Sequence, residues 1–213
     1  MGTRCNVIFT EAEDPRKWKS ADHTILYQHD DGYPDGMLPF LAKFVPTFMK
    51  YRGWYEIDHM SAQCLTQLVI ERRRILRRCE IRSAKWDRKY HNKKLNAIKK
   101  GKESMDNFDY HLKQSKEAYQ RLRVARDTPE TEITNYNDVL GHCINDFVAG
   151  DAEYVYVVAP TGVFAYDTHN VFMSDNIEDS SKWKSLLNKR EAKKCFKEGY
   201  LPPRYREDES EAA

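Results

Sequence analysis

The chain has 213 residues, enough for one well-buried core with an appendage, and its length alone does not require two domains. Aromatic residues make up 12% of it, which excludes a fully disordered chain, although 32% charged residues indicate much solvated surface. The formal net charge is only +2, which excludes a polycation, so the distribution of charge must decide which partners the protein attracts.

Five scattered cysteines without a CxxC pair predict reduced thiols rather than disulfides or a structural zinc site. No stretch of about 18 apolar residues and no apolar leader segment is present, so we expect a cytoplasmic protein without a membrane partner. The nucleotide-binding, zinc-protease and EF-hand motifs are absent, and the sequence predicts no metal and no cofactor.

The first elements are two strands, at 4–10 and 24–29, whose residue types and alternation predict an antiparallel pair. The polar segment 11–23 connects them.

The second strand ends in the crowded sequence HDDGYPDG, residues 29–36. One interpretation is turn chemistry, in which Asp31-Gly32 supplies a left-handed position and Pro34 fixes the backbone before a helix. The other is a ligand pocket, because a His beside carboxylates can act as a base or ligand; its candidate residues are His29, Asp31 and Tyr33. Both interpretations stay open at this point.

Helical spacing of apolar residues follows at 38–49, with Gly53 at the expected stop and Pro46 expected to split or kink the helix. A second helix is predicted over 59–98, where no Pro or Gly occurs, and Trp86 and Tyr90 continue its apolar stripe. Gly101 marks a reversal and a third helix follows over 108–127. The pattern indicates a helical hairpin of coiled-coil character, which also offers a surface for homo-oligomers.

After a helical or irregular piece at 137–147, the sequence EYVYVVA and the segment VFAYD predict two strands joined by PTG. A basic amphipathic helix is expected from Trp183 to Phe196. The predicted fold class is α+β, a small antiparallel sheet of about four strands with helices on one face and an inserted long basic helical hairpin. The predicted domains are a body at 1–70 and 127–196, an arm at 71–126 and a disordered acidic tail at 197–213.

Charge is distributed unevenly: residues 71–126 hold 19 Lys or Arg against 7 Asp or Glu, and the rest of the chain is net acidic. A positive helix with interspersed aromatics predicts contact with a phosphate backbone, while long exposed helices are also often basic without any such partner. The candidate nucleic-acid-binding residues are Arg72, Arg73, Arg74, Arg77, Arg78, Arg82, Lys85, Arg88, Lys89, Lys93 and Lys94.

Four segments carry a family resemblance: GTRCNVIF at 2–9, LYQHDDGYPDGMLPFL at 26–41, DHMSAQCLTQLVI at 58–70 and GDAEYVYVV at 150–158. Together they resemble a group of small uncharacterised bacteriophage and bacterial proteins with a TRxNxI start, an HxDGYPxG turn and a GDxEYVYVV strand. Asp30 stands where that group usually has Trp. The resemblance implies a compact α+β fold and a phage setting, and it leaves the basic arm unmatched.

These observations predict an accessory binding protein, more readily than an enzyme, that associates with nucleic acid without strong sequence preference in host takeover or counter-defence. Two alternatives stay open. One is an inhibitor that binds a host protein, with an acidic protein as partner of the arm or the negative body imitating nucleic acid. The other is a small-ligand binder or hydrolase that uses His29 and Asp31.

Overall fold

The computed structural model of the chain describes residues 3–29, 32–53, 55–128, 142–145, 147–174 and 176–205. The chain divides into two compact units. The first comprises Met1–Gln67 with Val139–Ala213, and the second comprises Leu68–Asp138. Within the described residues, no helix has the length and apolar character needed to cross a membrane.

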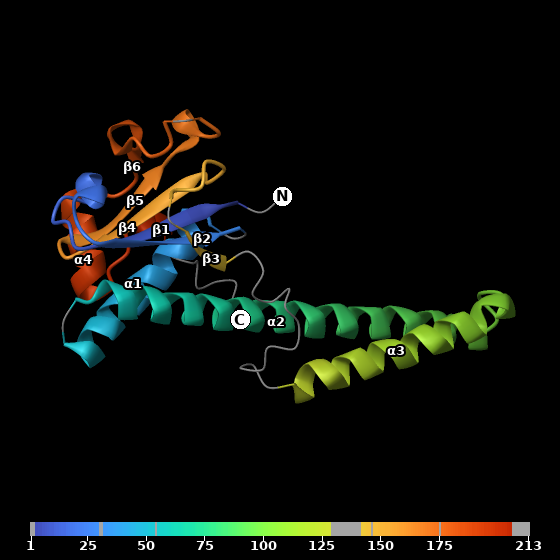
Figure 1. Cartoon of the computed structure of the whole chain (residues 1–213). Helices are drawn as coiled ribbons and strands as arrows, with labels where there is room; N and C mark the ends of the chain where they lie inside the picture. The colour runs from blue at the N-terminus through green and yellow to red at the C-terminus, as the bar shows by residue number, and fades with distance from the viewer. Residues whose placement is uncertain are drawn as a thin grey trace. The chain divides into compact units, whose positions relative to one another are not determined.

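The first unit is built on a six-stranded sheet in the order β3-β2-β1-β4-β5-β6 (Figure 1). Its strands are β1 (Cys5–Thr10), β2 (His23–Gln28), β3 (His142–Asn145), β4 (Tyr154–Ala159), β5 (Gly162–Asp167) and β6 (Lys184–Ser185). Neighbouring strands are antiparallel except for the central pair β1 and β4, in which Ile8 lies opposite Val157.

The α+β class is confirmed, but the expected antiparallel sheet of about four strands is wrong in two respects. The sheet is mixed, because the long excursion between β1 and β4 lets β4 return in the same direction as β1. It also has more strands, because β3 pairs with the free edge of β2 inside the segment expected to be helical or irregular, and the short β6 pairs with β5.

One face of the sheet is covered mainly by irregular segments. Its strand residues, among them Ile8, Val157 and Phe164, form a buried cluster with Trp18 and Trp183. Trp18 belongs to the short 3-10 helix η1 (Pro15–Ser20), in the connection between β1 and β2.

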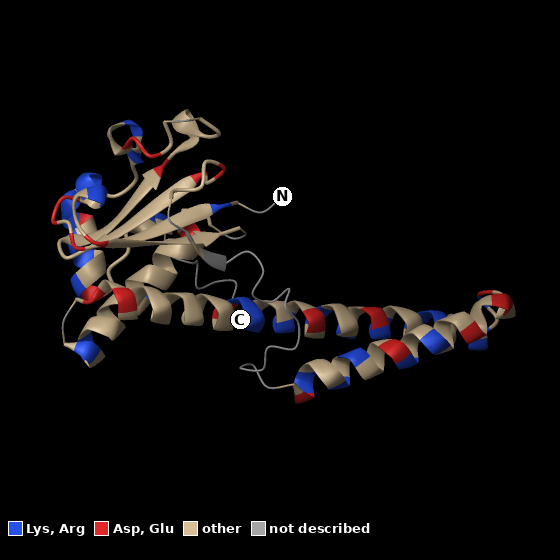
Figure 2. Cartoon of the chain, in the orientation of Figure 1, with Lys and Arg blue, Asp and Glu red and all other residues tan. Residues whose placement is uncertain are grey.

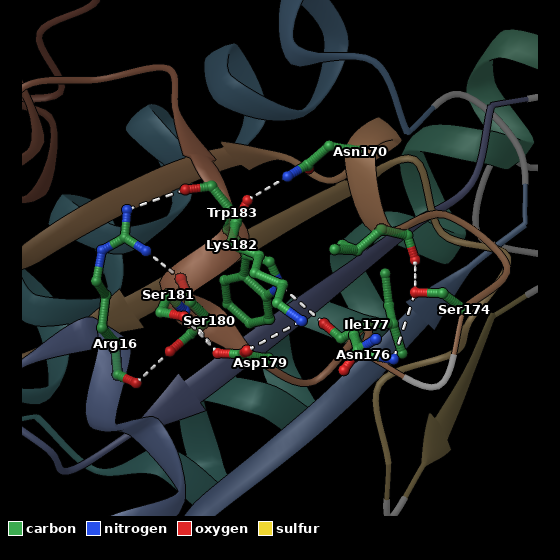
Figure 3. A network of polar contacts seen from close by, with 11 residues as sticks. Arg16, Asn170, Ser174, Asn176, Ile177, Asp179, Ser180, Ser181, Lys182 and Trp183 are labelled. Atoms are coloured by element: carbon green, nitrogen blue, oxygen red, sulfur yellow. Dashed lines mark hydrogen bonds and ion pairs between the residues drawn. The ribbon is translucent and has the colours of Figure 1, made fainter.

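A polar network fixes this covering layer (Figure 3). The Arg16 guanidinium donates to the carbonyl oxygens of Ser180 and Trp183, and the Ser180 hydroxyl donates back to the Arg16 carbonyl at 2.6 Å. The buried indole N–H of Trp183 donates to the carbonyl of Ile177 at 2.7 Å. These bonds satisfy polar groups that would otherwise be costly to bury, and they hold Trp183 and the η1 segment that carries Trp18 in place.

Helices cover the other side of the sheet (Figure 1). Helix α1 (Pro34–Arg52) runs through Pro39 and Pro46 without a break, although Pro46 was expected to split or kink it, and ends at Gly53 in the left-handed conformation (φ 85°). Helix α4 (Lys189–Glu198) packs along β5 and α1. It starts six residues later than the sequence pattern suggested, because Asn188 and Glu191 form a capping box there.

The HDDGYPDG segment is a tightly packed junction between β2 and α1. Pro34, expected in the turn before the helix, is itself the first residue of α1, a position that suits its fixed φ. Gly32 does not adopt the expected left-handed conformation. It is required for space instead, because a Cβ at this position would lie 2.8 Å from backbone atoms of Arg4 and Cys5. Asp30 and Asp31 lie outside the described residues.

The second unit contains a helical hairpin. Helix α2 (Ile57–Lys99) is followed by the 3-10 turn η2 (Met105–Asn107) and helix α3 (Phe108–Asp127), with Gly101 left-handed at the reversal. The buried apolar side chains of the hairpin include Ala84, Leu95 and Ile98 of α2 and Ala118, Leu122 and Ala125 of α3. Trp86 and Tyr90, placed on the apolar stripe by the sequence pattern, are exposed instead.

Polar contacts also join the two helices of the hairpin. Nδ1 of His91 lies 2.8 Å from Nδ1 of His111, and the Ser115 hydroxyl donates to the Asn92 side chain at 2.7 Å. Because these groups sit among small apolar side chains, they fix the pairing of α2 with α3 more specifically than the apolar contacts alone.

Candidate nucleic-acid interface

The eleven basic residues proposed from the sequence all lie on α2, but their surroundings differ. Arg73 is only 6% exposed and lies 3.9 Å from Glu80. Arg77 donates to the carbonyls of Ala125 and Arg126, at 2.7 and 2.6 Å, and thereby satisfies backbone acceptors at the end of α3. Arg73 and Arg77 therefore support the hairpin and do not present a free charge to a partner.

Other members of the set have partners within the hairpin. Arg74 pairs with Glu71 at 2.7 Å and Arg72 is half-buried. Lys94 pairs with Glu103 at 2.7 Å, and this hydrogen bond raises the pKa of Lys94. The guanidinium of Arg88 lies 4.7 Å from the ring centroid of Tyr119 on α3.

Five of the eleven form what we call the basic row: Arg78, Arg82, Lys85, Lys89 and Lys93. All five are exposed, and none has a carboxylate partner among the described residues. They follow one another at intervals of four, three, four and four residues, which places them along one side of a helix. At about 1.5 Å per residue the row is about 22 Å long.

The acidic residues of this part of α2 belong to other sides of the helix. Asp87 pairs with Arg121 of α3 at 2.7 Å, and Glu80 lies near the buried Arg73. The charges of the row are therefore not neutralised locally. Figure 2 shows the basic residues along α2 and the acidic residues between them.

An aromatic pair runs beside the basic row. Trp86 and Tyr90 stack with ring centroids 5.5 Å apart and an interplanar angle of 10°. Trp86 is 65% exposed and Tyr90 41% exposed. Trp86 is four residues after Arg82 and three before Lys89, so the pair borders the row on the same outward side of α2.

The basic residues of α3 differ from the row because most of them are paired. Arg121 contacts Asp87, Arg123 contacts Asp127 at 3.7 Å, and Lys113 contacts Glu117 at 4.0 Å. Unpaired positive charge in the hairpin is thus concentrated on α2.

The first unit holds the residues proposed for a ligand pocket. The Tyr27 hydroxyl donates to Asp151 at 3.3 Å and lies 3.1 Å from Nδ1 of His29. Because the hydroxyl donates its one hydrogen to Asp151, Nδ1 of His29 lies where it can donate to the hydroxyl oxygen. Arg4 pairs with Asp151 at 3.1 Å. These contacts among Arg4, Asp151, Tyr27 and His29 orient the His29 ring, whereas Asp31 lies outside the described residues.

A second histidine at the same end of the sheet was not predicted. Nδ1 of His169 lies 2.7 Å from Asp167, and its Nε2 lies 3.4 Å from Glu153. Desolvation raises the pKa of Asp167, but hydrogen bonds from the backbone and the ring of His169 lower it, and the pKa lies below its ordinary value. The His169 ring also meets the edge of Tyr154, whose other neighbour is Tyr33. The spacing DTH at 167–169 was the only sequence signal for this contact.

Burial raises the pKa of the Cys5 and Cys64 thiols, which makes both poor nucleophiles. Throughout the described part of the chain, no three His, Cys, Asp or Glu side chains come close enough together to hold a metal ion. Comparison of the chain with protein-family models, curated proteins and solved structures finds no match.

Proposed function

We propose that the protein binds nucleic acid through the outward side of α2, without strong sequence preference. The observation that carries this proposal is the basic row, five exposed Lys and Arg side chains aligned over about 22 Å with no carboxylate partner among the described residues. A row of positive charge of this length can lie along several of the regularly spaced negative charges of a phosphate backbone.

The kind of side chain in the row favours contact with phosphates over reading of bases. Lysine is a flexible point charge, and the two arginines are exposed and not held in a fixed orientation by any partner described. Base-specific recognition needs side chains held in register with base edges. Binding driven by the row should therefore tolerate many sequences and depend strongly on salt.

The experiment is a salt titration of binding to a fluorescent oligonucleotide. Five phosphate contacts predict a slope of log K against log salt of about −4.5 for duplex and about −3.5 for a single strand. Raising the salt from about 50 to 200 mM should then weaken binding by about 100- to 500-fold.

The test variant replaces Arg78, Arg82, Lys85 and Lys89 by Gln, and should lower the slope by about 3 to 4. The matched control replaces Lys113, Lys116, Arg123 and Arg126 of α3 by Gln, which removes the same charge from the same hairpin. We expect this control to retain most of the slope, because all four residues lie on α3, outside the basic row. Lys113 and Arg123 are already paired, and Arg126 lies in the last turn of α3.

Absent binding, or binding that does not change with salt, would refute the proposal. Equal losses in the two variants would show that overall charge matters and the row does not. An acidic protein partner gives a different result: capture from a cell extract by the wild-type chain, lost in the test variant and unaffected by nuclease treatment.

A further inference from the structure

We infer that the preferred ligand is a single-stranded nucleic acid with a base stacked on Trp86; this inference rests on the proposed function. Four observations carry it: the exposure of the indole, its support by Tyr90, its position beside the basic row and the geometry of the helix surface.

Trp86 is an unusual residue to find in solvent. An exposed tryptophan on a helix leaves a large apolar surface in water, and Trp86 is 65% exposed. Its ring is nearly parallel to Tyr90, so Tyr90 backs one face of the indole. The exposed fraction shows that much of the remaining ring surface is open, which is the arrangement of a stacking platform.

Tyr90 is itself held in place. The edges of the rings of His91 and His111 meet it, with centroids 5.1 and 6.4 Å away and interplanar angles of 84° and 75°. His91 and His111 in turn contact each other across the hairpin. The backing of Trp86 is therefore connected to the helix pairing, so the platform is ordered before a ligand binds and little entropy is lost on binding.

The position of the platform suits a single strand. Phosphates that follow the basic row would place their bases to one side of it, and Trp86 lies on the side of the row between Arg82 and Lys89. In a duplex the faces of the bases are stacked on one another, and exposing one costs a few kcal/mol. A single strand offers its bases at much lower cost, and any base can stack, so the preference is for strandedness and not for sequence.

The test compares an oligothymidylate of about 15 nucleotides with a duplex of the same length, both measured by fluorescence anisotropy at one salt concentration. Trp86→Ala should weaken binding of the single strand by about 5- to 150-fold, the range expected for loss of one base–aromatic stack. Duplex binding should change by less than about 2-fold, because it depends on the basic row alone.

Two further variants control the experiment. Trp86→Phe keeps a stacking ring and should recover much of the lost affinity. Tyr51→Ala removes an exposed aromatic side chain of α1, outside the hairpin, and should change neither affinity. Binding of the single strand should also quench part of the tryptophan fluorescence of the wild type, and this quenching should be absent in Trp86→Phe, which keeps the other three tryptophans.

The possible failures are distinguishable. If the wild type binds neither probe, the proposed function fails and this inference fails with it. If it binds both probes with a steep salt dependence but Trp86→Ala leaves single-strand binding unchanged, only the inference is overturned. A wild type that prefers the duplex overturns the inference in the same way.

Discussion

Replacement of Gly32 by Ala tests whether the junction between β2 and α1 depends on the absence of a side chain. The Gly32 amide donates to the Thr3 carbonyl at 2.8 Å, and its carbonyl accepts from the buried Tyr156 hydroxyl at 2.9 Å. An added Cβ would lie 2.8 Å from the carbonyl carbon of Arg4 and the amide nitrogen of Cys5. These are backbone atoms inside the sheet, so they cannot move aside as the end of a flexible side chain can.

The expected loss of stability follows from the contacts that the added methyl group would disturb. Overpacking of a tight site costs about 1–3 kcal/mol. If the segment moves away from β1, the Tyr156 hydroxyl loses its partner while buried, which costs about 1–3 kcal/mol more. We therefore expect Gly32→Ala to lower the free energy of unfolding of the first unit by about 2–5 kcal/mol, a large part of the stability of an ordinary domain.

The assay is urea unfolding followed by near-ultraviolet circular dichroism, to which the buried Trp18 and Trp183 of the same unit contribute. The matched control is Gly150→Ala, because a Cβ there has no atom within 4 Å and Gly150 is not left-handed. Gly150→Ala also includes the stabilisation of about 0.4–1 kcal/mol that Ala gives by reducing the conformational entropy of the unfolded chain. A Gly32→Ala protein as stable as the Gly150→Ala protein would refute the close packing of Gly32 against β1.

Two predictions concern the hairpin. Arg77→Gln should destabilise it by about 1.5–3 kcal/mol, because two carbonyls at the end of α3 lose a charged donor, whereas the neighbouring exposed Arg78→Gln should change it by less than about 0.5 kcal/mol in thermal unfolding. Partial desolvation and His111 lower the pKa of His91 below its ordinary 6.5, with Asp87 acting in the opposite direction. The unfolded chain then binds this proton more readily than the folded hairpin, so stability should fall as the pH drops below about 6.5. Helix unfolding measured by circular dichroism at several pH values should show this fall, and His91→Asn should reduce it.

Local patterns in the sequence were enough to locate most helices and the longer strands. The alternation in β1, β2, β4 and β5 is visible in their residue types, and the uninterrupted run of α2 ends near Gly101 as expected. These elements could be found because their signals lie within a few neighbouring residues. β3 and β6 have four and two residues, and they exist because an edge of the sheet was available for pairing. No local signal specifies that edge.

The order of the strands in the sheet could not be predicted from the sequence for a related reason. β1 and β4 are neighbours in the sheet although about 145 residues separate them, and the pairing is parallel. Hydrophobic alternation states which face of a strand is buried, but it is the same for parallel and antiparallel partners.

The inward side of the hairpin was partly misjudged because several of its buried side chains are small. Ala84, Ala118 and Ala125 allow close approach of two helices, yet they weigh little in a search for large apolar side chains. The same search favoured Trp86 and Tyr90, which the structure places in solvent. Because Trp86 and Tyr90 are exposed, they can form the stacking platform of the proposed interface, although the sequence pattern suggested that they were core residues.

The charge count of the arm indicated a class of partner, but it could not indicate which charges are available. Arg77 and Arg78 are adjacent in the sequence and identical in chemistry, yet Arg77 satisfies carbonyls at the end of α3, whereas Arg78 belongs to the basic row and has no carboxylate partner among the described residues. A helix turns about 100° per residue, so adjacent arginines meet different surroundings. The interface is therefore defined by which side of α2 faces α3, and a variant that reverses charges without regard to that side would disrupt folding and binding together.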